Sequence, residues 1–366
     1  MRLLFSVSCV WLFLVCLLAS VPVPAAACTG MRVIAKDGTV AFARSMEFGL
    51  DTKSSLMVTP RSLSWTGITP KGETGLHWKN AYAFMGPDIF GDALPAEGIN
   101  EKGLYVGAFF FQEPSANVHT EPADYPKVVS LLQIPAWLLG TCATVDEVRH
   151  AIKTIALSET FVKSIDMIPH GHWIVIDNQG KSIVLEITDS KLHAYDNPVG
   201  VLTNAPEFPW QLTNLRNYVN LHAINAAPQK LGDLTVVPAG QGSGMLGLPG
   251  DYTPPSRFVR AVFLSNFAKP VTNDGEAVIL AWNLINNFSI PVGVSGEQDA
   301  TGKTAYDYTQ WQTVYDLTRH LIYFRTYDNQ NIRTVSLDKF LNGKKSLFIP
   351  MVGVKATYQD VSGEAK

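Results

Sequence analysis

The sequence predicts an α+β protein built from antiparallel sheets covered by helices. Two hairpin signals in the first half of the 366-residue chain indicate antiparallel strand pairs. Two long stretches in the second half repeat apolar residues at helical spacing, and strand-like segments return after them. Because helical segments are interposed among the hairpins and later strands, antiparallel sheets covered by helices are expected.

The hairpins define the most regular strands. Residues 31–35 and 40–44 flank the turn Lys-Asp-Gly-Thr, and an Asp-Gly pair between two apolar runs is a strong hairpin signal. Residues 173–176 and 182–188 flank a second turn, at 177–180. Each pair therefore predicts two antiparallel neighbours in a sheet.

The other predicted elements follow along the chain. Residues 144–153 open with Thr-Val-Asp-Glu, a capping-box pattern for a helix. Helices are also predicted at 257–266 and 276–287, and strands at 313–317 and 320–327. No internal repeat, low-complexity linker or coiled-coil heptad interrupts the sequence, so one large domain is expected.

The first 27 residues have the composition of a secretory signal peptide. A positive start at Arg2 precedes an apolar run over 3–20, and prolines then lead to three alanines that end at Ala27. The run is nearly long enough for a transmembrane anchor, but the prolines and alanines favour cleavage after Ala27. An exported protein, periplasmic or secreted, is expected, with Cys28 as its first residue.

Two chemistries compete for Cys28. Small residues before a cysteine resemble a bacterial lipobox, and a lipidated Cys28 would make the chain an anchored binding protein without catalysis. Ala25 stands where a lipobox usually has Leu, and a hairpin begins at once instead of a flexible tether. A free N-terminal cysteine that acts as a catalytic nucleophile is therefore favoured.

Charge and cysteine content exclude several classes of protein. The formal net charge of −3 becomes −4 when Arg2 is removed, and no run of Lys or Arg occurs, so nucleic acid and anionic membranes are poor partners. Cys9 and Cys16 leave with the signal peptide, and the remaining Cys28 and Cys142 are no disulfide framework. Cys142 stands in an apolar stretch and is expected in the core.

Three motif matches fail on their context. Residues 242–247 spell G-x-G-x-x-G, but prolines follow where a helix should begin. Residues 296–304 have five residues, not four, between the glycines of a phosphate loop. His170 and His172 have no third metal ligand nearby, and no G-x-S-x-G elbow occurs. Neither a metal nor another cofactor is expected.

A free N-terminal cysteine is equipped for amide hydrolysis. An α-amine titrates nearer neutrality than Lys, so Cys28 can supply both a nucleophile and its base. Arg44 and Glu47 end the strand that is predicted to pair with the Cys28 strand, so both charged groups can return beside the thiol. The site also needs donors that stabilise an oxyanion.

These residues resemble a family, the choloylglycine hydrolases, which includes conjugated bile salt hydrolases and penicillin V acylases. The resemblance runs in order from Cys28 to about Leu341, in the blocks 28–29, 44–47, 98–104, 196–206, 211–218, 248–260, 311–317 and 323–329. It implies a four-layer αββα sandwich of the N-terminal-nucleophile hydrolase type, with two stacked antiparallel sheets covered by helices. It also implies a homotetramer.

The same resemblance divides the chain and assigns roles. Residues 1–27 are a signal peptide, 28–341 a single catalytic domain and 342–366 a C-terminal extension. The catalytic residues that it implies are Cys28 as nucleophile and base, Arg44 beside the thiol, Asn204 in the oxyanion hole with a backbone N–H near Phe109, and Arg257 as organiser of the site's charge. Taken singly, each position could have a purely structural role, as a surface, turn or helix-start residue. Together the four positions favour a catalytic site.

Glu47 departs from the family pattern, in which Asp is commoner, although its carboxylate could still bond the α-amine from one methylene further out. Apolar side chains expected to bind substrate are Met46, Phe48, Phe110 and Phe111, together with Phe109. Alternate members of this aromatic run could instead face the core.

The expected substrate is a linear amide with an apolar or aromatic acyl group. Penicillin V and acyl homoserine lactones rank first, because an exported chain with Arg-Ser-Met-Glu at 44–47 looks more like the Gram-negative branch of the family. Conjugated bile salts rank next.

Overall fold

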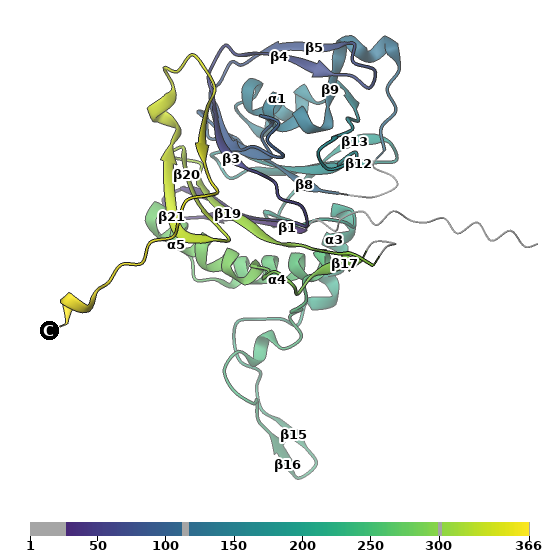
Figure 1. Ribbon diagram of the computed structural model, residues 1–366. Helices are drawn as coiled ribbons and strands as arrows, with labels where there is room; N and C mark the ends of the chain where they lie inside the picture. The colour runs from purple at the N-terminus through teal and green to yellow at the C-terminus, as the bar shows by residue number, and fades with distance from the viewer. Residues whose placement is uncertain (1–26, 112–116, 299–301, 366) are drawn as a thin grey trace, which may run out of the picture.

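The protein is a four-layer sandwich in the computed structural model, which describes residues 27–111, 117–298 and 302–365. Figure 1 shows two sheets stacked face to face, with α4 and α5 covering one outer face and α1 covering the other. The predicted αββα layering of antiparallel sheets is therefore confirmed. The predicted signal peptide, apart from Ala27, lies outside the described residues.

The six-stranded sheet carries the N-terminal part of the described chain. Its strands, in spatial order, are β14 (Val201–Leu202), β1 (Ala27–Ile34), β2 (Val40–Phe48), β19 (Tyr308–Asp316), β20 (Leu321–Thr326) and β21 (Asn329–Ser336). All of these pairings are antiparallel.

The eight-stranded sheet faces it. Its strands, in spatial order, are β13 (Lys191–Asp196), β12 (Ser182–Thr188), β11 (Gly171–Ile176), β8 (Tyr105–Phe110), β7 (Glu97–Asn100), β6 (Phe84–Pro87), β3 (Ser55–Thr59) and β22 (Leu347–Pro350). Because β22 lies at the edge of this sheet, the fold continues into the segment that was set apart as a C-terminal extension.

Short strand pairs decorate the sandwich. They are β4 (Ser64–Ile68) with β5 (Thr74–Lys79), β9 (Val128–Ser130) with β10 (Ala156–Ser158), β15 (Gln229–Leu231) with β16 (Leu234–Val236), and β17 (Gly296–Gln298) with β18 (Thr304–Tyr306). The pair β15–β16 forms the tip of a long arm, residues 219–247, that projects away from the sandwich on the α4 side (Figure 1).

The α-helices are α1 (Ile134–Thr141), α2 (Val145–Ala151), α3 (Phe208–Asn214), α4 (Pro254–Phe267) and α5 (Asp274–Ile285). Thr144 caps α2 as predicted, because its side chain accepts the backbone N–H of Glu147 at 3.2 Å. Pro254 begins α4, three residues before the predicted start, since proline fits the first helical turn. Helix α1 was missed because nearly every residue in it is buried.

The β1–β2 hairpin positions the functional residues. Cys28 is paired with Met46 and Gly30 with Arg44, so these side chains share the face that looks toward the other sheet. Gly30 permits this approach, since a Cβ there would lie 2.5 Å from the Phe42 ring and 2.8 Å from the Phe109 ring. A larger residue at position 30 would therefore push the two sheets apart.

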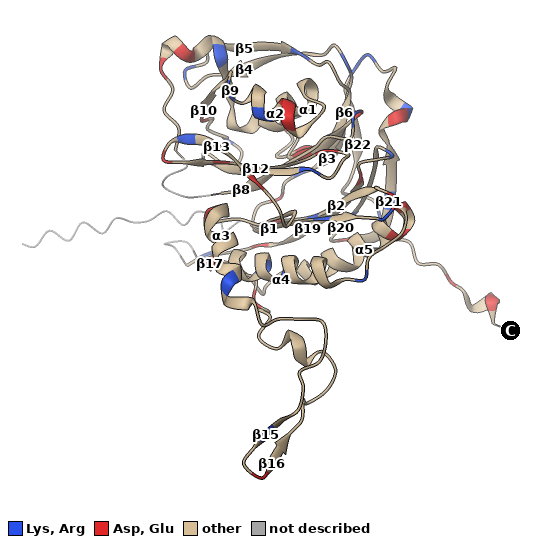
Figure 2. Cartoon of the chain, turned by 180° about the vertical axis from the view of Figure 1, so that it is seen from behind, with Lys and Arg blue, Asp and Glu red and all other residues tan. Residues whose placement is uncertain are grey.

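Charged residues are scattered over the sandwich. Figure 2 shows Lys and Arg interspersed with Asp and Glu, and most of the arm carries neither. Within the described residues, no helix combines the length and apolar character needed to cross a membrane.

Candidate active site

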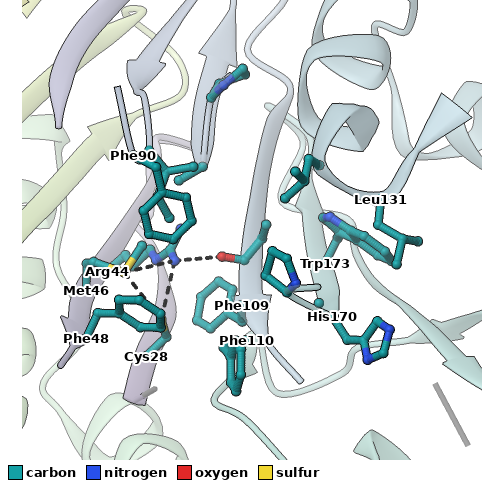
Figure 3. A pocket seen from close by; sticks show the side chains of 17 residues that line it. Cys28, Arg44, Met46, Phe48, Phe90, Phe109, Phe110, Leu131, His170 and Trp173 are labelled. Carbon is teal, nitrogen blue, oxygen red and sulfur yellow. Dashed lines mark hydrogen bonds between the residues drawn. The ribbon is translucent and has the colours of Figure 1, made fainter. Parts of the chain in front are cut away.

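A pocket opens between the two sheets beside the Cys28 thiol (Figure 3). Apart from Cys28, Arg44 and His170, apolar side chains and glycine line it. The aromatic members are Phe48, Phe90, Phe109, Phe110 and Trp173. A cysteine and one arginine at the base of an aromatic pocket can hold an apolar group while a polar bond is attacked.

The Cys28 thiol is buried and in contact with a cation. Its side chain is 1% exposed, and Arg44 Nη2 lies 3.4 Å from Sγ. Met46 Sδ is 3.8 Å from the same sulfur. Burial by itself would lower the Arg44 pKa, but the negative charges of Cys28 and Glu97 raise it above its ordinary value. Arg44 therefore remains charged and places a fixed positive charge beside the Cys28 sulfur.

Arg44 is fixed from several sides. Its Nη1 donates to Glu97 Oε2 at 2.9 Å, and its Nη2 donates to the Ala108 carbonyl at 2.6 Å. The guanidinium also lies over the ring of Phe109, 4.5 Å from the centroid, and 5.4 Å from the Trp311 ring. These contacts leave the cation with one orientation beside the sulfur.

Glu97 is a site residue that was not singled out from the sequence. The side chain has no exposed surface and accepts hydrogen bonds from Arg44, Tyr105 at 2.7 Å, Thr313 at 2.7 Å and Tyr315 at 3.0 Å. Burial, with the Glu97 charge, raises the pKa of both tyrosines well above the ordinary value, so they stay protonated donors. A charged residue immediately before the family-like block at 98–104 was the signal that could have found it.

Asn204 links the Cys28 backbone to the opposite sheet. Its Oδ1 accepts from Cys28 N at 2.8 Å and from Arg257 Nη2 at 2.8 Å, while its Nδ2 donates to the Phe110 carbonyl at 2.8 Å. A flipped amide would place its NH₂ against two donors, so this orientation is the consistent one. The second Nδ2 hydrogen is left for another acceptor.

Arg257 organises the groups behind Cys28. The fully buried guanidinium donates to the Cys28 carbonyl, to Thr29 Oγ1 at 2.8 Å and to the Tyr252 carbonyl at 2.8 Å. Burial lowers the Arg257 pKa, and the charges of Glu47 and Cys28 act against that shift. The predicted helix-start residue is thus a buried cation held by N-terminal strand β1.

Glu47 lies on the other face of the hairpin from the thiol. It pairs with Ala27 across β1–β2, and its Oε1 accepts from Thr309 at 2.7 Å. Oε2 has no partner within the described part of the chain. Burial raises the Glu47 pKa to about 7, although the nearby Arg257 charge lowers it. A buried carboxyl is therefore present on β2 opposite Ala27, one position after the residue that pairs with Cys28.

Strand β8 decides which backbone N–H faces the pocket. Phe111 N donates to the His170 carbonyl on the neighbouring strand at 3.0 Å, and backbone groups alternate sides along an antiparallel strand. Phe109 therefore directs its N–H toward β11, whereas Phe110 directs its N–H and C=O away from it, toward Asn204. The backbone donor predicted near Phe109 is better assigned to Phe110.

The predicted substrate-binding residues divide into two groups. Met46, Phe48 and Phe110 line the pocket together with Phe109. Phe111 does not, which corrects its prediction: its ring is fully buried and stacks on His172, with 4.5 Å between the centroids. Position 111 is the point at which the aromatic run turns from the pocket into the core.

Cys142 is a core residue and is not part of the pocket lining. Burial raises its pKa to about 11, so its thiol is inert at neutral pH. Cys28 and Cys142 are both free thiols. In the described ranges no three side chains of the metal-ligating types come together.

Known proteins are similar in sequence to this chain. The family described as "Linear amide C-N hydrolases, choloylglycine hydrolase family" matches residues 28–346. A bile salt hydrolase/transferase from Clostridium perfringens is 32% identical over 85% of this chain and 93% of its own. A penicillin V acylase from Pectobacterium atrosepticum is 28% identical over 81% of this chain and 77% of its own.

Solved structures share the fold. A mutant of the conjugated bile acid hydrolase from Clostridium perfringens superposes with a TM-score of 0.80 at 29% identity, covering 91% of this chain and 99% of its own. The penicillin V acylase from Agrobacterium tumefaciens gives a TM-score of 0.71 at 21% identity, covering 90% of this chain and 94% of its own.

Proposed function

Since the chain belongs to the choloylglycine hydrolase family of linear amide C–N hydrolases, we propose that it hydrolyses an N-acyl amide with Cys28 as the nucleophile. The observation that supports this proposal is the set of contacts made by Cys28. The Cys28 sulfur contacts Arg44, and the Cys28 nitrogen is held 2.8 Å from Asn204 Oδ1. Both reactive atoms of an N-terminal cysteine are thus fixed beside an apolar pocket.

The reaction begins when the Cys28 α-amine takes the thiol proton and the thiolate attacks the amide carbonyl carbon. The Asn204 Nδ2–H and the Phe110 N–H stabilise the oxyanion that forms. The α-ammonium then returns its proton to the leaving nitrogen as the C–N bond breaks, which leaves a thioester. Water gives a proton to the same amine, attacks the thioester and releases the carboxylic acid and the thiol.

This mechanism requires that residues 1–27 be removed, because Cys28 N is otherwise a peptide nitrogen without basicity. We therefore propose export with cleavage after Ala27, to the periplasm or the medium. Glu47, which is paired with Ala27 in the hairpin, would then stand beside the new α-ammonium and stabilise its charge.

The rival proposal, a lipidated binding protein, fits the site poorly. The Cys28 side chain is 1% exposed and lies in the interior of the β1–β2 hairpin face. A thioether-linked diacylglycerol at this sulfur would have to fill the pocket instead of a membrane. The burial of the thiol therefore supports the enzyme.

An aromatic pocket supports an aromatic acyl group, such as the phenoxyacetyl group of penicillin V. Phe48 and Phe110 stand with their ring centroids 6.2 Å apart in an edge-to-face arrangement, and Phe90 lies 5.7 Å from Phe48. Conjugated bile salts are the second candidate, because several relatives at 28–33% identity are bile salt hydrolases. Acyl homoserine lactones, with a flexible fatty acyl chain, are the third.

Two measurements test the proposal. The intact mass and N-terminal sequence of the protein from its native export route should give an unmodified chain that starts at Cys28; a diacylglyceryl mass would exclude the mechanism. Hydrolysis of penicillin V, a glycine-conjugated bile salt and an acyl homoserine lactone should then be compared side by side. Turnover of none of the three would refute the substrate assignment.

We also propose that the protein assembles as a homotetramer through the arm. Seven apolar side chains of residues 219–247 are more than two-fifths exposed: Val219, Ile224, Leu231, Leu234, Val236, Val237 and Leu246. An extended apolar hairpin cannot bury these side chains against its own sandwich, and a second copy of the chain is the partner that the resemblance suggests.

A further inference from the structure

We propose that His172 and Glu186 form a positioning pair that holds Asn204 in the orientation needed for the oxyanion. This inference rests on the proposed function, since it concerns the same tetrahedral intermediate. Both side chains are fully buried, although neither touches Cys28 and neither lines the pocket. A charged pair in this place requires a reason, because burying two ionisable groups is unfavourable unless their hydrogen bonds are made.

The pair makes its hydrogen bonds to the segment that carries Asn204. His172 Nδ1 lies 2.8 Å from Glu186 Oε2, and His172 Nε2 lies 3.0 Å from the Thr203 carbonyl. Glu186 Oε1 and Oε2 accept the Phe208 N–H at 3.0 and 3.1 Å. The two contacts thus bracket Asn204, one residue before it and four residues after it.

The protonation of the pair follows from its partners. A carbonyl oxygen only accepts, so His172 Nε2 must carry a proton, and a second proton must lie between Nδ1 and the Glu186 carboxylate. An imidazolium–carboxylate pair satisfies both bonds. Charge-assisted hydrogen bonds of this kind are stronger than neutral ones, so they hold the Thr203 carbonyl firmly.

The pair also bridges the two sheets. His172 is on β11 and Glu186 on β12, both in the eight-stranded sheet, whereas Thr203 follows β14 of the six-stranded sheet. The Phe111 ring stacks on the imidazole with an interplanar angle of 19°. Phe111 directly follows Phe110, the residue whose backbone N–H faces the pocket. One buried unit therefore sets the distance between the two oxyanion donors, Asn204 Nδ2 and Phe110 N–H.

This role predicts that amide hydrolysis and thiol alkylation respond differently to loss of the pair. Amide hydrolysis passes through an oxyanion, whereas alkylation of the Cys28 thiol by iodoacetamide does not. Loss of the positioning pair should therefore lower kcat for hydrolysis far more than it lowers the alkylation rate of Cys28. Removing one oxyanion donor costs about 10²–10³-fold in kcat, so a misplaced Asn204 should cost about 10–100-fold.

The experiment compares two variants of the mature, full-length protein. Glu186→Gln removes the charge, and Glu186→Asp keeps it but withdraws the carboxylate by one methylene, so that the imidazole retains a counter-charge if the glutamine variant fails to fold. Both should show reduced kcat, an almost unchanged KM and a much smaller change in the alkylation rate of Cys28. Asp338→Asn is the matched control, since it neutralises the carboxylate of a His–Asp pair, His320–Asp338 at 3.0 Å, that lies outside the pocket.

Three results would overturn the positioning role. These are an unchanged kcat in the folded Glu186 variants, a parallel loss of alkylation, or an equal effect of Asp338→Asn. Failure of the proposed function looks different, because the wild-type protein would then hydrolyse no amide, or Cys28→Ala would retain hydrolysis.

Discussion

Arg44 and Glu97 form a fully buried ion pair, with 2.9 Å between Nη1 and Oε2, and the same guanidinium contacts the Cys28 sulfur through its other nitrogen. The carboxylate therefore determines where the cation beside the thiol lies. Tyr105, Thr313 and Tyr315 complete the shell of the carboxylate. The environment of the Cys28 thiol thus depends on Glu97, which acts on it through Arg44.

Replacement of Glu97 by Gln should destabilise the fold and slow the reactions of Cys28. Removing one partner of a buried ion pair typically costs about 3–5 kcal/mol, because the remaining charge is unpaired. Urea unfolding would measure the loss, and iodoacetamide alkylation would measure the thiol. The double variant Arg44→Leu/Glu97→Gln should be more stable than the sum of the two single effects predicts. Strict additivity would show that the two residues are not coupled.

Cys28→Ala should abolish amide hydrolysis while the fold is retained. Cys142→Ala is the matched control, because Cys142 is the second free thiol of the described chain and lies in the core. It should reduce stability through the small cavity that it leaves and change kcat little. Hydrolysis by the Cys28 variant would show that another group is the nucleophile.

Glu47 should make the protein less stable as the pH rises, as long as Cys28 N is a peptide nitrogen. The folded-state pKa of about 7 lies above the ordinary glutamate value of 4.5, so the folded state binds more protons between these pH values. By linkage, stability falls as pH rises through this window, by about 3 kcal/mol at pH 8 relative to pH 4.

Glu47→Gln should remove this part of the pH dependence. The test uses a chain with a polar extension before Ala27, unfolded in urea at pH 4, 6 and 8. Asp307, whose pKa burial likewise raises to about 7, contributes to both proteins and cancels in the difference. A wild-type minus variant difference that is constant with pH would contradict the shifted pKa of Glu47.

The arm should mediate self-association. Leu231→Lys and Leu234→Lys together place two charges at its tip, where these side chains are 61% and 64% exposed. Sedimentation should show a lower mass than for the wild-type protein. Ile279→Lys is the control, because Ile279 is 62% exposed on α5 and not on the arm. An unchanged mass in the double variant, or a wild-type monomer, would exclude assembly through the arm.

Local sequence patterns predicted the strands and helices whose formation depends mainly on their own residues. The Asp-Gly turn fixed the β1–β2 hairpin, and residues 182–188 match β12 to the residue. Helix α1 and the edge strand β22 were missed, because a helix buried on all sides has no amphipathic period and an edge strand depends on its partner. Cys28, Arg44, Asn204 and Arg257 were chosen through resemblance to a family, and the structure places these four residues in contact with one another.

The residues that were missed are those whose role depends on contacts distant in sequence. In the sequence, Glu97 looks like an ordinary polar residue, and only the fold brings Arg44 and Tyr315 into contact with it. His172 was considered only as a metal ligand together with His170, and was rejected in that role. Its partner Glu186 is 14 residues away on the next strand. Phe109, Phe110 and Phe111 are indistinguishable by type, and only the register of β8 separates their backbones.

Ala27 already belongs to β1, paired with Glu47, in the chain that still carries it. The Cys28 sulfur, the Arg44 cation and the Asn204 amide are therefore assembled while the peptide bond before Cys28 is intact. Under the proposed mechanism, cutting that bond turns an amide nitrogen into a base among side chains that are already in place. The moment of activation would then be set by the peptidase that makes this cut.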